Sequence, residues 1–130
     1  MASIQRTVAL VVGIVFVLVG ILGFIPSLVS GGDLLGIFAV NTLHSIVHLL
    51  FGILGIVAAY SGWPRTYNRV FGVIYLLLAV LGFIPGLSSN GSLLGIVAIN
   101  TADNFLHLVI GLVLAIVGFF VADRVVASRA

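Results

Sequence analysis

Two segments carry most of the residues that could do chemistry in this apolar chain. They read NTLHSIVHLLFG at residues 41–52 and NTADNFLHLVIG at residues 100–111. Residues three or four apart lie on one face of a helix, so each segment places its ionisable side chains on a common face. These four side chains are the candidate site residues: His44, His48, Asp103 and His107.

Three imidazoles and one carboxylate suit a divalent transition metal. Imidazole binds Zn, Cu, Fe or Ni, and a carboxylate can complete the ligand set. A His pair at i and i+4 is the arrangement found on HExxH helices. The chain has no Glu to serve as a general base, so metalloprotease chemistry is not supported, and no catalytic residue is assigned.

Three other interpretations of the group remain open. Haem b fits between His48 and His107, with Gly52 and Gly111 leaving room for the ring. Chains of His and Asp also serve proton relays and small-solute pathways in membranes. In the simplest interpretation the polar side chains only join helices to one another.

The composition indicates the environment in which these residues lie. Of 130 residues, 62% are hydrophobic and 6% are charged. A soluble domain has roughly 25% charged residues, and disordered chains are polar, so neither class fits. Five scattered Arg make no nucleic-acid-binding patch. The absence of Cys excludes disulfides and thiolate sites.

Four apolar segments are long enough to cross a bilayer as helices, which takes about 20 residues each. We therefore expect an all-α membrane protein with four transmembrane helices. Pro26 and Pro85 mark the ends of the first and third spans. The four expected spans are Thr7–Ile25, Thr42–Tyr60, Thr66–Ile84 and Thr101–Ala122.

The chain contains an internal repeat. Residues 6–62 align with residues 65–121 at a constant offset of 59, which relates His48 to His107. Each repeat holds two spans, so both have the same orientation, related by a pseudo-two-fold axis along the membrane normal. We expect two tandem parallel repeats in a single membrane domain over residues 1–130. If the second and fourth spans meet at the axis, His48 faces His107 and His44 faces Asp103.

Other polar and small residues of the two segments have structural interpretations. Asn and Thr at the start of each segment are expected to cap the helices. Asn104 extends the polar stripe. Gly52 and Gly111 are expected to allow close helix packing. The expected cap residues are Asn41, Thr42, Asn100 and Thr101.

The loops between the spans of each repeat contain apolar runs of their own. Residues 26–41 and 85–100 each hold a Gly-containing turn followed by LLGIFAV or LLGIVAI. We expect a short interfacial or re-entrant helix in each loop, with Asp33 and Ser92 as helix caps. A strand is less favoured, because lipid does not tolerate exposed sheet edges.

The arginines predict the orientation. All five lie on one side of the expected membrane, which the positive-inside rule makes cytoplasmic, with both termini. Aromatic residues at 60, 63 and 67 lie at the same boundary, as interfacial aromatics do. The five are Arg6, Arg65, Arg69, Arg124 and Arg129.

The repeated pattern GFIP…LLG…NTxH…H…G resembles an uncharacterised family of small bacterial four-helix membrane proteins, a domain of unknown function. The resemblance covers nearly the whole chain and implies four spans and an integral membrane location, here expected to be a bacterial inner membrane. The family carries no established activity. The short chain and its few soluble residues favour a non-enzymatic accessory or structural subunit, within a larger membrane complex or a homo-oligomer. A metal or haem protein and a small-solute or proton pathway are the alternatives.

Overall fold

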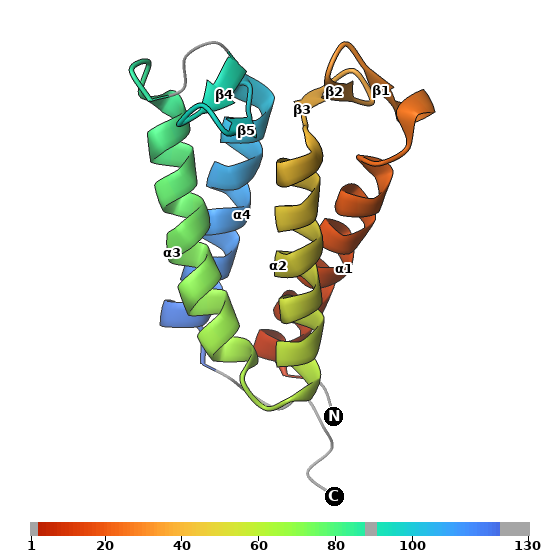
Figure 1. The fold of residues 1–130 in the computed structure, drawn as a ribbon. Coiled ribbons are helices and arrows are strands. Elements are labelled where there is room, and N and C mark those ends of the chain that lie inside the picture. Colours follow the sequence, from red (N-terminus) through yellow and green to blue (C-terminus); the bar gives the residue numbers. More distant parts are fainter. Residues whose placement is uncertain (1–2, 88–90, 123–130) are drawn as a thin grey trace, which may run out of the picture.

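Four long helices make up most of the computed structural model, which describes residues 3–87 and 91–122. All four are long and apolar enough to cross a membrane, which indicates a multi-pass membrane protein. The expected spans are thereby confirmed to within three residues at each end (Figure 1). The helices are α1 (Ile4–Leu22), α2 (Thr42–Tyr60), α3 (Pro64–Phe83) and α4 (Thr101–Phe120).

The helices pack as two close pairs, α1 with α2 and α3 with α4. Glycines make this approach possible. A Cβ added to Gly52 would lie 2.6 Å from the carbonyl oxygen of Gly13 on α1. In the second repeat, a Cβ on Gly111 would lie 2.7 Å from the amide nitrogen of Leu76 on α3. Each close pair therefore comes from one repeat, and α2 and α4 do not form such a pair.

Aromatic side chains fill the space between the two pairs. Phe16 of α1 and Tyr75 of α3 occupy equivalent positions in the repeats, and their rings stack 5.0 Å apart with an interplanar angle of 2°. Both side chains are 1% exposed. The stacked rings therefore lie where the two repeats meet.

The start of α1, the link from α2 to α3 and the end of α4 lie together at one end of the bundle, here called the arginine end (Figure 1). Arg65 and Arg69 each donate from Nε to the carbonyl oxygen of Gly118, at 3.0 and 2.7 Å. They satisfy a carbonyl near the end of α4 that has no helical partner. Arg124 and Arg129 lie outside the described residues.

The opposite end, here called the strand end, corrects the expectation for the loops. Each loop forms a small antiparallel sheet instead of a helix, and Asp33 and Ser92 lie in strands instead of capping helices. The first loop also begins with a short 3-10 helix at Pro26–Leu28. The strands are β1 (Val29–Ser30), β2 (Asp33–Leu34), β3 (Phe38–Ala39), β4 (Ser92–Leu93) and β5 (Val97–Ala98).

The apolar runs form hairpins because they fold back at Leu-Gly. Leu35 and Gly36 have φ of 54° and 72°, and the amide of Ile37 donates to the carbonyl of Leu34 at 3.0 Å. Two successive positive φ values define the tight turn that suits a hairpin. The second loop repeats it, with Leu94 at φ 53°. Pairing within the hairpin satisfies the backbone groups that a single strand would leave open.

The two loops are joined to each other by reciprocal hydrogen bonds. Asn41 donates from Nδ2 to the carbonyl of Ile96 at 3.0 Å, and Asn100 donates from Nδ2 to the carbonyl of Ile37 at 2.9 Å. The offset of 59 relates each donor and each acceptor to its counterpart. Accordingly β3 packs on α4 of the other repeat, and β5 packs on α2.

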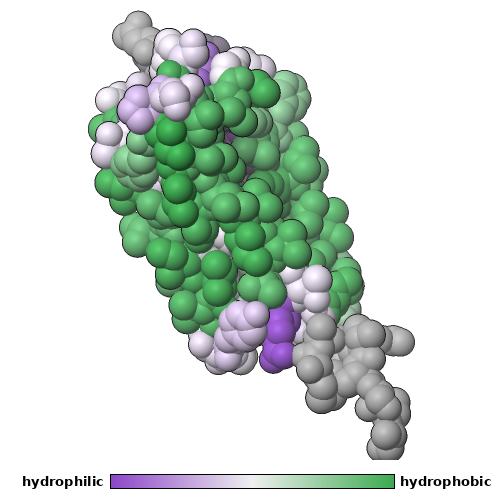
Figure 2. Space-filling model, turned by 90° about the vertical axis from the view of Figure 1, so that its right-hand side faces the viewer, coloured by the Kyte–Doolittle hydropathy of each residue, from purple (hydrophilic) through white to green (hydrophobic). Residues whose placement is uncertain are grey.

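The outside of the bundle is apolar along the helices. Figure 2 shows one face on which hydrophobic residues cover the length between the two ends, with hydrophilic residues gathered at the ends. Large apolar side chains are exposed on every helix, for example Leu18, Leu50, Leu77 and Val109, each more than half exposed. Such a surface fits contact with lipid.

Candidate metal centre

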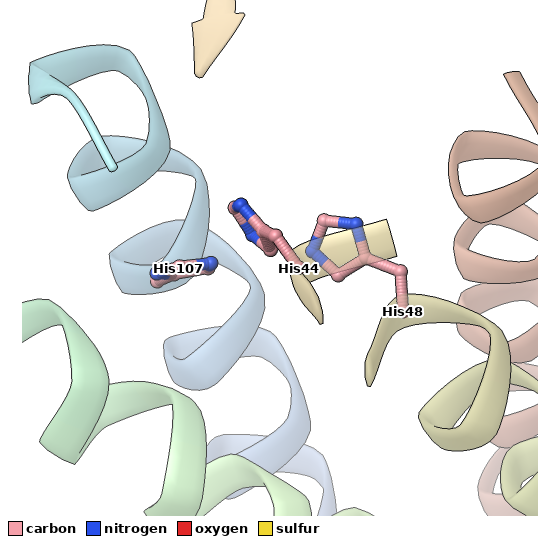
Figure 3. A group of neighbouring side chains, drawn as sticks. All are labelled: His44, His48 and His107. Carbon is pink, nitrogen blue, oxygen red and sulfur yellow. The ribbon is translucent and has the colours of Figure 1, made fainter. Parts of the chain in front are cut away.

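Three histidines meet inside the bundle near its strand end. His44 and His48 lie one turn apart on α2, and His107 lies on α4 (Figure 3). One ligand nitrogen from each ring can be chosen so that all three lie within 4.8 Å of one another. The side chains are 2–3% exposed. This set is here called the His triad.

His44 lies between the other two rings. Its ring centroid is 4.3 Å from that of His48 and 6.0 Å from that of His107. Figure 3 shows the three rings gathered in the space between α2 and α4. Main-chain groups of Ala39 in β3 and Ala98 in β5 interact with the His44 side chain, so both loops help to hold this ring in place.

Most ring nitrogens of the His triad lack a partner among the described residues. Nδ1 of His44, both nitrogens of His48 and Nδ1 of His107 are buried and accept or donate no hydrogen bond there. The large majority of buried side-chain polar atoms are paired, so four unpaired nitrogens in one cluster require an explanation. Their geometry leaves them free to bind an ion or an exogenous ligand.

Aromatic rings line the side of the His triad that faces the arginine end. Phe16 lies 5.2 Å from His48, and Tyr75 lies 5.5 Å from His107, measured between ring centroids. The Tyr75 hydroxyl is also buried without a partner in the described part of the chain. These rings pack directly against the imidazoles of the His triad.

Asp103, the fourth candidate, has a different role in the structure. Its Oδ2 accepts from the amide of Asn100 at 3.1 Å, and its own amide donates to Oδ1 of Asn100 at 2.9 Å. This is a capping box at the start of α4. Across residues 3–87 and 91–122, no hydrogen bond or ion pair joins Asp103 to His44, so the expected carboxylate–imidazole pair is absent there.

The other singled-out residues hold the helices that carry the His triad. Asn41 caps α2 by accepting from the amide of His44 at 2.9 Å, and Asn100 caps α4. Thr42 and Thr101 are the first residues of these helices. The Asn104 amide nitrogen donates to the carbonyl of Gly82 at 2.9 Å. A Cβ added to Gly52 would meet α1, and one added to Gly111 would meet α3.

Sequence reasoning missed the aromatic and loop residues around the cluster. Phe16 and Tyr75 are related by the offset of 59, which could have identified them as a pair at the axis. Nothing local marks Ala39 and Ala98 as neighbours of His44, because each reaches the histidines only through the folding of a loop.

The chain was then compared with known proteins. The family described as a domain of unknown function, DUF4383, matches residues 6–120. The chain belongs to the DUF4383 family. The DUF4383 match runs from the first turn of α1 to the last residue of α4, so it takes in both repeats and the whole His triad. No curated protein and no solved structure matches the chain.

Proposed function

We propose that this DUF4383 protein binds a transition-metal ion at the His triad, inside the membrane and near the strand end. The observation that carries the proposal is the convergence of three buried imidazoles with four unpartnered nitrogens. Neutral imidazole nitrogen is the commonest metal ligand of proteins at neutral pH. An ion would bind one nitrogen from each of the three rings.

The spacing supports an ion of the zinc type. Bonds of 2.0–2.1 Å in a tetrahedral site place nitrogens about 3.3 Å apart. The nitrogens of the His triad lie within 4.8 Å of one another, so small ring rotations bring them to that spacing. Three protein ligands leave a fourth position open, as in catalytic zinc sites. The proposed coordinating residues are His44, His48 and His107. Asp103 is engaged in the capping box of α4 and is not among the ligands.

Haem b receives less support from this geometry. The proposed axial pair was His48 and His107, but the His44 ring lies beside both of them. A macrocycle between the pair would need the space that this ring fills. The glycines expected to make room for it face α1 and α3.

The orientation is part of the same proposal. Arg6, Arg65 and Arg69 all belong to the arginine end, which the positive-inside rule places in the cytoplasm. The His triad then lies in the outer half of a bacterial inner membrane. An accessory or structural subunit is the second candidate, favoured by a described surface that is mostly lipid-facing side chains.

Elemental analysis with a visible spectrum tests the proposal. The protein is purified in mild detergent without chelator and without a polyhistidine tag. We expect about one metal ion per chain in the natural protein and almost none in His48→Ala/His107→Ala, since the remaining imidazole cannot hold the ion alone. Val109→Ala, two residues from His107 on the exposed face of α4, should keep the metal.

Each other result has a definite meaning. Metal-free, colourless natural protein that also fails to take up added Zn²⁺ or Co²⁺ overturns the proposal and leaves the accessory subunit. A Soret band selects haem. Equal metal content in the natural protein and the double variant places the ion elsewhere.

A further inference from the structure

A cavity of about 220 Å³ adjoins the His triad on the side of α3. Apart from the histidines and Tyr75, every side chain that lines it is apolar. The walls come from α2, α3, His107 of α4, the β4–β5 hairpin and the residue that follows it, Ile99. The apolar lining residues are Val47, Phe51, Ile74, Leu78, Leu93, Val97 and Ile99.

The rim of this cavity belongs to the lipid-facing surface. Val47 and Phe51 on α2 and Ile74 and Leu78 on α3 are all partly exposed. These two helices belong to different close pairs, so the seam between them is less tightly packed than either pair. In a membrane the cavity therefore faces the hydrocarbon of the leaflet at the strand end, and a ligand reaches it from lipid instead of from water.

The volume and the polarity define the ligand. An apolar cavity of about 150 Å³ stays dry and binds benzene, so one of about 220 Å³ takes a single substituted ring. The polar groups of the lining are the histidine nitrogens and the Tyr75 hydroxyl, while the opposite side leads to lipid. A matching molecule carries a polar oxygen on its ring at one end and an apolar tail at the other.

We propose that the cavity binds a lipid-soluble compound of the quinone class, with its ring between α2 and α3 and one ring oxygen at the open fourth position of the metal. The oxygen contact rests on the proposed metal site. Binding of the ring in the apolar part of the cavity does not depend on the metal, because the walls there contain no ligand to the ion.

The pseudo-symmetry supplies a suitable blocking variant. Phe38 occupies in the first repeat the position that Val97 occupies in the second. The fold therefore already accommodates a Phe at this position of the first hairpin. In the second hairpin, the ring introduced by Val97→Phe would project into the cavity. Val47→Phe blocks the same cavity from α2 and serves if Val97→Phe does not fold. Val80→Phe is the matched control, because Val80 on α3 is 57% exposed and lines no part of the cavity.

The experiment titrates Co²⁺-loaded protein with a decyl-tailed benzoquinone and follows the visible bands of the ion and the thermal unfolding temperature. We expect a saturable change of the Co²⁺ bands and a higher unfolding temperature. Val97→Phe should weaken the quinone affinity about tenfold or more, because the added ring fills space that the quinone ring needs. It should leave the Co²⁺ content unchanged, and Val80→Phe should behave as the natural protein.

The outcomes separate the two proposals. Failure to bind Co²⁺ overturns the metal site and with it the oxygen contact. Bound Co²⁺ with no quinone effect on either readout overturns the quinone site alone. Equal quinone affinity in the natural protein and in both cavity variants also overturns it, because the quinone then binds elsewhere.

Discussion

One position of the repeat is occupied by His44 in the first copy and by Asp103 in the second, and the two side chains have different structural roles. His44 contributes a ring to the His triad, and Asp103 closes the capping box of α4. The proposed ligand set is therefore three neutral imidazoles without a carboxylate. A divalent ion held by them would keep its charge, which would favour an anionic or strongly polar group at the fourth position.

Replacement of Asp103 separates the two roles. Asp103→Ala should keep the metal content of the natural protein, because its carboxylate is outside the His triad. It should lower the free energy of unfolding by about 1 kcal/mol through loss of the capping box. Elemental analysis and thermal unfolding of the same preparation measure both effects. A loss of metal comparable to that of His48→Ala/His107→Ala would instead make Asp103 a ligand.

At the scale of elements, the helices were predictable and the loops were not. The length and apolarity of a span follow from the bilayer thickness, and the start of α2 and of α4 matches the expected residue. The loops depend on a Leu in the left-handed conformation and on bonds to the other repeat. An apolar run of seven residues contains neither signal, so its hydrophobicity alone indicated a helix.

The close packing of each helix pair depends on glycine. Gly52→Ala places a Cβ 2.6 Å from both the Gly13 oxygen and the Val17 nitrogen, which are backbone atoms and cannot turn aside. We expect a loss of about 1–3 kcal/mol in the free energy of unfolding, measured thermally in detergent. Gly86→Ala is the control, because a Cβ there meets no atom within 4 Å. Equal stability of the two variants would contradict this account of the α1–α2 contact.

For the whole molecule, the repeat predicted more of the site than any single segment did. The offset of 59 pairs His48 with His107, and both lie in the His triad. The place of His44 could not be read from the repeat, because its counterpart is Asp103 and its ring is held by both loops. The cavity could not be predicted from the sequence either, because its walls come from α2, α3 and β4–β5, which only the tertiary fold brings together.

The orientation can be tested with single cysteines, because the natural chain has none. Ser30→Cys lies at the strand end and Ser61→Cys at the arginine end, and both serines are exposed. In intact cells a membrane-impermeant maleimide should label Ser30→Cys alone, and Ser61→Cys should react only after permeabilisation, since the proposed orientation places the arginine end in the cytoplasm. The reverse pattern would invert the proposed topology, and labelling of both in intact cells would mean mixed orientations.

The reciprocal bonds between the loops have a consequence for the rate at which an ion leaves. Asn41 and Asn100 tie each loop to the opposite repeat directly above the histidines. An ion bound at the proposed site would have a residence time set by the opening of these two hydrogen bonds as well as by its affinity. Asn41→Ser/Asn100→Ser removes both Nδ2 donors but keeps an oxygen that can cap each helix. All three ligands remain, so the metal should still bind, yet a chelator should remove it about tenfold faster. Asn104→Ala, whose bond stays within the second repeat, should release metal at the natural rate. If the double variant also kept the natural rate, escape through the side of the bundle would control exchange.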